Sequence, residues 1–320
     1  MTDLLLLSGD ASWRSRQVRY YAGDWASVIS ILPDFELTPF AAGEDEPANP
    51  LLQTVLRLPL SKAERPIPVG VVSHTYTLAP HREVAALCRE GLLQAGFKSE
   101  DLRYEAGLSE LGEWMNFRIY CPPSHNFRDA CAQNLDLRLE CFNSVDGSSR
   151  LTILFGWYRL ICSNGLVIGE SMIEIRERHG HAMELETIPK RIRSAYDSVA
   201  SDRLRMERWI KDRVAIQDIA KWADETVTDS WGKKAATRIF HICSTGTDVE
   251  IDDPFARGAA TENPVRYLDR VPGCLEQAST KYDVCQALSF VASHRNNAEE
   301  RLAWQSDIPR LLALLPARGF

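Results

Sequence analysis

The spacing of apolar positions differs between the middle of the chain and the regions on either side of it. From about residue 110 to residue 187 apolar and polar side chains alternate, which is the pattern of strands with one buried and one solvated face. In the clearest run Leu137 and Leu139 face one way, while Arg138 and Glu140 face the other and are expected to meet solvent. The alternation predicts strands over residues 114–121, 135–143, 150–162 and 172–178, with a return over residues 181–186.

Helical spacing occurs on both sides of this stretch. Pro80 can occupy the first turn of an early helix that runs to about Ala95. Gly96 follows as its stop, because glycine enters the left-handed conformation without steric cost. After Thr187 the apolar spacing becomes about 3.6 residues. This later pattern predicts one long or kinked helix over residues 187–214 and shorter helices over 216–223, 230–242, 280–294 and 308–315.

The order of these elements predicts the fold class and three regions. Strands with one early helix, followed by helices, indicate an α+β protein. We expect an antiparallel sheet with the early helix packed on it, followed by a helical C-terminal part. Prolines interrupt the start of the chain, so residues 1–64 are predicted to be an N-terminal extension of short strands and loops. Residues 65–187 form the predicted strand-rich core domain, and residues 188–320 the helical region packed on that core.

Composition narrows the class of protein. The 320 residues are 45% hydrophobic and 25% charged, as in ordinary globular proteins. The net charge of −7 excludes a global basic field for nucleic acid, although residues 190–213 carry a local excess of positive charge. We find no secretory signal and no stretch long enough to span a membrane. Most of the eight cysteines lie in apolar runs, which favours a reducing compartment, so a cytoplasmic location is expected.

A motif in the strand-rich part carries a family resemblance. Residues 143–165 resemble the core of the phage/plasmid-like family known as domain of unknown function 932, and residues 71–76 and 282–289 are weaker echoes of the same pattern. The resemblance implies a protein carried by phages or plasmids. It does not imply a particular mechanism. The matching residues are Asn143, Ser144, Asp146, Gly147, Ser148, Arg159, Cys162, Asn164 and Gly165.

A looser likeness concerns the order of elements, which is similar to that of Erf-type phage annealing proteins. Those proteins bind single strands in a groove between a sheet and basic helices, and the resemblance implies single-stranded DNA as partner and annealing as activity. It also implies a homo-oligomer. The candidate nucleic-acid-binding residues are Arg138, Arg150, Arg159, Lys190, Arg191, Arg193, Arg203 and Arg205.

Two alternatives stay open at this point. The basic run over residues 190–213 has about even odds of being only the solvated face of an amphipathic helix. The acidic balance of the whole chain also suits a non-catalytic protein-binding module that acts on host defence or replication proteins. In either case the sequence favours a protein that is not an enzyme and needs no cofactor.

The candidate chemistry is sparse. The turn over residues 143–149 could hold an anion on its backbone N–H groups, but a hairpin whose Asp and Ser side chains bond their own backbone is favoured. Cys162 at a strand end could be a nucleophile, yet a buried structural thiol has better odds because no basic partner is evident. His179 and His181 are weak metal candidates, since standard ligand spacing is missing. Phosphate-binding loops, Rossmann fingerprints and hydrolase elbows do not occur in the sequence.

Overall fold

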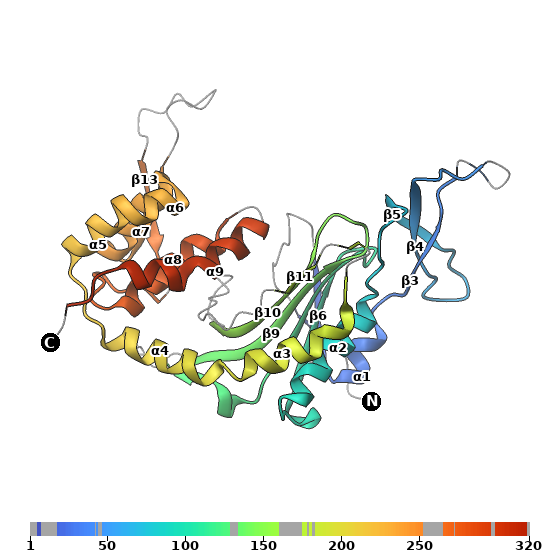
Figure 1. Ribbon diagram of the computed structural model, residues 1–320, viewed down its shortest axis with the longest axis horizontal. Coiled ribbons are helices and arrows are strands. Elements are labelled where there is room, and N and C mark those ends of the chain that lie inside the picture. The colour runs from blue at the N-terminus through green and yellow to red at the C-terminus, as the bar shows by residue number, and fades with distance from the viewer. Residues whose placement is uncertain are drawn as a thin grey trace. The chain divides into compact units, whose positions relative to one another are not determined.

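The protein folds into two compact units (Figure 1). The computed structural model describes residues 5–7, 18–41, 43, 47–128, 134–159, 175–177, 179–180, 183–251, 265–271, 273–295 and 298–318. The first unit comprises Met1–Asn126, Asp136–Gly156 and Ser171–Val199. The second comprises Phe127–Leu135, Trp157–Glu170 and Ala200–Phe320.

A mainly antiparallel sheet forms the centre of the first unit. Every strand pair whose register is described runs antiparallel. Arg19–Gly23 comes from the region predicted as an extension, yet it lies inside the sheet between two other strands. Among the described residues the strand order is β1 (Leu5–Leu7), β2 (Arg19–Gly23), β6 (Arg103–Leu108), β7 (Trp114–Tyr120), β9 (Asn134–Ser144), β10 (Leu151–Arg159) and β11 (Ile175–Glu177), and β8 (Phe127–Arg128) pairs with β9.

One face of this sheet is apolar and is covered by helices. Phe117 of β7 pairs with Cys141 of β9, and both are fully buried. The Cys141 thiol contacts Cys88 of α2 (His81–Gln94), so this face lies under α2. Trp25 of α1 (Trp25–Ser30) meets Tyr104 of β6 edge to face, with ring centroids 5.3 Å apart. The early helix therefore packs on the sheet as the sequence predicted.

Helix α3 (Ile188–Tyr196) packs closely against α2. A Cβ atom placed on Gly91 of α2 would lie 2.7 Å from the Cβ of Ile192, closer than real atoms approach. Glycine at this position thus sets the separation of the two helices. The predicted long helix over residues 187–214 is kinked, because α3 ends at Tyr196 and α4 (Val199–Lys211) begins three residues later.

A second, three-stranded sheet belongs to the same unit. It consists of β3 (Phe35–Pro39), β4 (Leu52–Arg57) and β5 (Ile67–Ser73), in that order. Its inner face packs Val55 and Val72 against Val145, which lies in the turn after β9. Gly70 leaves room for this turn, since a Cβ there would lie 2.7 Å from the Asp146 Cα.

Helices dominate the second unit, together with one two-stranded ribbon. Helix α8 is its centre, since almost all of its side chains are buried. A capping box between Thr280 and Asp283 fixes the start of α8. The described elements after α4 are α5 (Ile216–Trp222), a π-helical turn (Ala223–Val227), α6 (Thr228–Trp231), α7 (Lys233–Thr245), β12 (Thr247–Ile251), β13 (Val265–Arg270), α8 (Lys281–Ser293) and α9 (Ala298–Leu314).

The α+β class is confirmed, because antiparallel sheets and helices both occur and the helices are concentrated in the C-terminal half. One local prediction was wrong. Leu185–Thr187 form a 3₁₀ helix leading into α3, where a returning strand was expected. The division into three regions stays a prediction. Among the described residues, no helix has the length and apolar character required to cross a membrane.

Replacing Gly91 with alanine tests the contact between α2 and α3. Alanine usually stabilises a helix interior by about 1 kcal/mol over glycine. Here we expect a net loss of stability, because overpacking costs about 1–3 kcal/mol. Urea unfolding of Gly91→Ala would measure it, with Gly180→Ala as control, since a Cβ at Gly180 meets nothing within 4 Å. A Gly91→Ala protein as stable as the wild type would contradict the contact.

Candidate functional site

The family motif begins with a hydrogen-bonded chain that is fully buried. The Asn143 side-chain amide donates to the Ala79 carbonyl at 2.8 Å and to Nδ1 of His81 at 2.9 Å. His81 Nε2 lies 2.9 Å from the Gly112 carbonyl and must donate to it, because a carbonyl only accepts. One tautomer of His81 is therefore fixed, and the chain joins three segments that lie far apart in the sequence.

The turn that follows is closed by its own side chains. The Asp146 carboxylate accepts the backbone N–H of Ser148 at 3.0 Å and its hydroxyl at 2.6 Å, and its other oxygen accepts Trp114 Nε1 at 2.9 Å. Ser144 Oγ accepts the backbone N–H of Ser149 at 3.0 Å. These N–H groups are occupied, which supports the structural hairpin over an anion site.

The upstream echo of the motif packs against this turn. Tyr76 donates its hydroxyl to the carbonyls of Ser144 and Val145 at 3.3 and 3.1 Å. Its ring stacks on His179, with centroids 5.0 Å apart. His179 in turn lies 3.2 Å from the Thr77 carbonyl through Nδ1, and burial lowers the pKa of the imidazole. The upstream echo and the turn over residues 143–149 thus form one structural cluster.

The metal candidates gain no support from the described residues. Among them, no group of three or more His, Cys, Asp or Glu side chains is placed to hold a metal ion. The motif and metal candidates that lie outside the described residues are Cys162, Asn164, Gly165 and His181.

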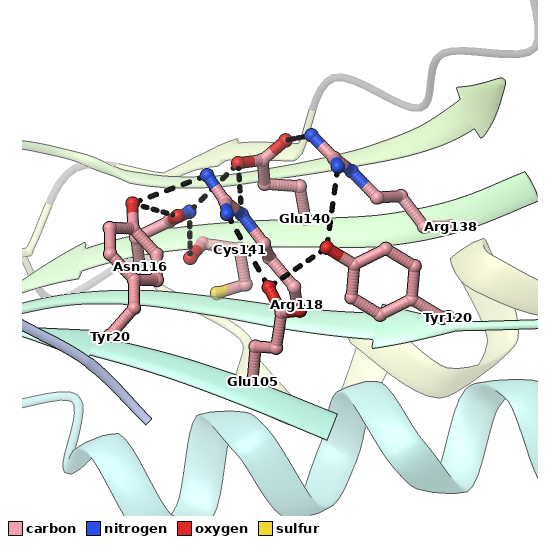
Figure 2. A network of polar contacts seen from close by, with 8 residues as sticks. All are labelled: Tyr20, Glu105, Asn116, Arg118, Tyr120, Arg138, Glu140 and Cys141. Atoms are coloured by element: carbon pink, nitrogen blue, oxygen red, sulfur yellow. Dashed lines mark hydrogen bonds and ion pairs between the residues drawn. The ribbon is translucent and has the colours of Figure 1, made fainter. Parts of the chain in front are cut away.

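The polar face of the main sheet holds a buried ionic network (Figure 2). The Glu140 carboxylate lies between two guanidinium groups, 2.9 Å from Arg118 Nε and 3.0 Å from Arg138 Nη2. Asn116 donates its amide to Glu140 at 3.2 Å and accepts the Tyr20 hydroxyl at 2.7 Å. The residues come from β2, β7 and β9, so strand register brings them together.

A second carboxylate completes the network on β6. Glu105 accepts the Tyr120 hydroxyl at 2.8 Å and lies 3.5 Å from Arg118 Nη1. The Arg118 guanidinium also covers the Tyr20 ring, 4.4 Å from its centroid. Two arginines thus face two glutamates, and Figure 2 shows all of these side chains pointing toward one another above the strands.

Burial and charge shift the pKa values in this network. Burial alone would raise the pKa of Glu140, but Arg138 and Arg118 outweigh it and hold the value at about 2. Burial raises the pKa of Tyr20 and of Tyr120 to about 12. The carboxylate is therefore ionised and both phenols are neutral at every physiological pH.

The alternation of β9 led us to expect this face to meet solvent, and that expectation was wrong. Asp136, Arg138 and Glu140 are each only 5–6% exposed. Glu140 pairs with Arg138 of the same strand and with Arg118 of β7, so these buried charges lie beside opposite charges. Arg138, one of the predicted nucleic-acid contacts, therefore has a buried guanidinium that pairs with a carboxylate.

The other predicted contacts lie in different settings. Lys190 and Arg193 are exposed on α3, and Arg191 is partly buried there. Arg150 is partly buried at the start of β10, and the side chain of Arg159 lies outside the described part of the chain. Since α3 and α4 fall largely in different units, a common groove stays a prediction.

Helix α4 contains the last two predicted contacts, and each has an acidic neighbour. Arg205 pairs with Asp202, which is almost fully buried. Arg203 lies 3.4 Å from Glu207 in an exposed pair one turn away. Exposed pairs of this kind contribute little, so Arg203 can exchange its partner for a ligand at small cost.

The downstream echo of the motif lies in the core of the second unit. Gln286 and Ser289 stand one turn apart on α8 and are 4% and 1% exposed. Within the described part of the chain, neither Gln286 Nε2 nor Ser289 Oγ has a hydrogen-bond partner. This burial could not be predicted from the sequence, because polar residues on a helix are usually solvated.

The fold and these networks define an α+β protein whose motif residues mainly hold segments of the chain together. Residues 68–311 match the family described as Domain of unknown function (DUF932). This match spans well over half of the chain, so the protein belongs to that family, as the resemblance predicted. No curated protein and no solved structure shows significant similarity to it.

Replacing Glu140 with glutamine tests the buried network. Glutamine keeps the shape but removes the charge that compensates Arg118 and Arg138. Breaking a buried pair costs about 3–5 kcal/mol, and we expect a loss of that size in urea unfolding. Glu207→Gln on α4 removes an exposed partner and should cost less than about 1 kcal/mol. Equal losses in the two variants would show that the network is not buried as described.

Stability should also fall in acid through His81. Burial lowers the pKa of His81 from 6.5 to about 4. Between these values the unfolded chain binds more protons, so this contribution is complete above pH 6.5 and is lost as pH falls towards 4. The full loss is roughly 3 kcal/mol.

Urea unfolding across this pH range, with wild type and His81→Gln, measures that contribution. The variant should be less stable at neutral pH and should show a shallower dependence on pH. The contribution of Glu140 falls in a separate window, from 4.5 to about 2. An unchanged slope in the variant would rule out His81 as the titrating group.

Proposed function

We propose that this protein binds single-stranded nucleic acid through the exposed face of α4, without catalysis, in the DNA metabolism of a phage or plasmid. The observation that carries the proposal is the set of side chains on that face. Arg203, Arg208 and Lys211 are exposed there, with Leu204 between them at 65% exposure. Such a concentration of cations contrasts with the net charge of −7 of the whole chain.

The opposite face of α4 explains why the helix presents its cations outward. Met206 and Trp209 are buried and fix the orientation of the helix. Asp202 is also buried on that side, where Arg205 neutralises it. The buried face thus fixes the direction of Arg208 and Lys211, and the buried carboxylate of Asp202 pairs with Arg205 instead of with them.

The chemistry of the face suits a single strand. Phosphate groups attract Arg208 and Lys211, and this attraction is the main source of affinity for nucleic acid without sequence preference. Single-strand binders add apolar or aromatic contacts with the exposed bases. Leu204 offers such a contact in the middle of the cations. Arg118 and Arg138 on the sheet lie within the buried network, so the proposal does not use them.

Charge reversal on α4 tests the proposal. Arg208→Glu with Lys211→Glu should weaken binding of labelled oligothymidylate at low salt by at least about tenfold. Each phosphate contact contributes about 0.7 to the slope of log affinity against log salt, so this slope should fall by about 1.4. Fluorescence anisotropy over a salt series measures both quantities.

A matched control carries the same change of charge elsewhere in the second unit. Lys221 and Lys233 are exposed on α5 and α7, and Lys221→Glu with Lys233→Glu should leave affinity and slope nearly unchanged. If the wild type does not bind at low salt, or if both double variants lose affinity equally, the α4 surface is not the binding site.

The second candidate function, a non-catalytic module that binds host defence or replication proteins, has one observation in its favour. Val71 lies on the outer face of the three-stranded sheet and is 50% exposed. Leu51, the residue before β4, is also exposed, at 63%, and exposed aliphatic side chains that gather into a patch mark protein contacts. This candidate becomes the better one if the wild type shows no affinity for single strands.

A further inference from the structure

Tyr267 of β13 is the most exposed large hydrophobic side chain in the described part of the protein, at 73%. It lies on the ribbon formed by β12 and β13 in the second unit (Figure 1). Its backbone partner in the ribbon, Val249, is only 3% exposed. The ribbon thus buries one residue of the pair and presents the other, although a tyrosine ring has a large apolar area to bury.

The ribbon is anchored firmly to α7. Arg238 forms two charge-assisted hydrogen bonds to the Asp248 carboxylate, at 3.0 and 2.6 Å. Asp248 lies where the register of the ribbon shifts, and it is 5% exposed. His241 Nε2 lies 3.1 Å from the Thr247 hydroxyl, one turn further along α7. The exposed tyrosine is therefore carried by a fixed support.

The ring itself has a support on one side. The His241 and Tyr267 ring centroids lie 5.5 Å apart at an angle of 41°. This contact leaves most of the Tyr267 ring accessible, as its exposure shows. An aromatic ring held in place and open to solvent is the arrangement on which unpaired bases stack.

Cationic side chains accompany the ring along the same strand. Arg266 and Arg270 have side chains that are 73% and 60% exposed. Arg266 lies 2.6 Å from Glu250, and Arg270 lies 3.8 Å from Glu276. Because all four side chains are more than half exposed, these pairs are weak and can yield to phosphate.

We propose that Tyr267 is a stacking position for an unpaired base of single-stranded nucleic acid, with Arg270 on the same face of the ribbon and Arg266 on its other face for the backbone phosphates. The inference rests on the proposed function and adds a contact of a different kind, on a different element of the same unit. Phosphate contacts on α4 supply affinity that depends on salt, while stacking on Tyr267 depends on the bases being unpaired.

Substitution of Tyr267 separates the two kinds of contact. Tyr267→Ala should weaken binding of an oligothymidylate about 5- to 150-fold, the range for one lost base stack. The salt slope should stay the same, because no charge is removed. Binding of a duplex should change little, since its bases are already paired. Tyr267→Phe keeps the ring and should retain the affinity of the wild type.

A spectroscopic signature reports stacking directly. An oligonucleotide with 2-aminopurine should lose fluorescence on binding to the wild type and to Tyr267→Phe, and should lose less on binding to Tyr267→Ala. Leu314→Ala is the matched control, because Leu314 is 55% exposed on α9 and its loss should change neither affinity nor fluorescence.

The outcomes distinguish this inference from the proposed function. If the wild type binds single strands with a steep salt dependence but Tyr267→Ala binds equally well, the stacking position is refuted while the α4 surface stands. Oligoglutamate serves as an anionic polymer without bases. If Tyr267→Ala loses equal affinity for single strands, duplex and oligoglutamate, stacking is likewise refuted, since only unpaired bases offer a free ring face. Absence of any binding by the wild type would remove the proposed function itself.

Discussion

The ionised carboxylate of Glu140, buried between Arg118 and Arg138, is the constraint on which the main sheet depends. Two guanidinium groups and two carboxylates can lie under cover only if the strands hold one register, because a slip by one residue would turn every charge to the other face. The apolar face under α2 and the polar face thus specify the same alignment of β2, β6, β7 and β9. Removing these charges from water is unfavourable, and our hypothesis is that they are retained because they select the strand register.

A second network of hydrogen bonds holds the end of β9 and the turn after it, and it contains residues of the family motif. Asn143 and His81 connect the end of β9 to α2, and the Asp146 carboxylate holds Trp114 and the turn after β9. Tyr76 closes the same cluster from the upstream echo. Among the described motif residues, Asn143 and Asp146 thus join segments that are distant in sequence. Family membership therefore specifies an architecture here, and function has to be sought on surfaces that the motif leaves free.

Those surfaces lie in the second unit and offer two complementary kinds of contact. On α4 a cationic face surrounds Leu204, and on the β12–β13 ribbon Tyr267 stands open beside arginines. Charge attracts a phosphate backbone at long range but does not distinguish single from double strands. An open aromatic ring acts only at contact and requires an unpaired base. Together the two would combine affinity from charge with a preference for single strands from stacking.

The sequence by itself determined the class of fold, the early helix on the sheet, the kinked helix after Thr187 and the turn at Asp146, because each depends on periodicity or on local turn chemistry. The motif over residues 143–165 was also sufficient to identify the family. Only the tertiary structure decided that Arg138 is buried, that Arg19–Gly23 joins the main sheet and that Tyr267 is exposed. Alternation in one strand shows which residues share a face, but whether that face meets water depends on partners from other strands.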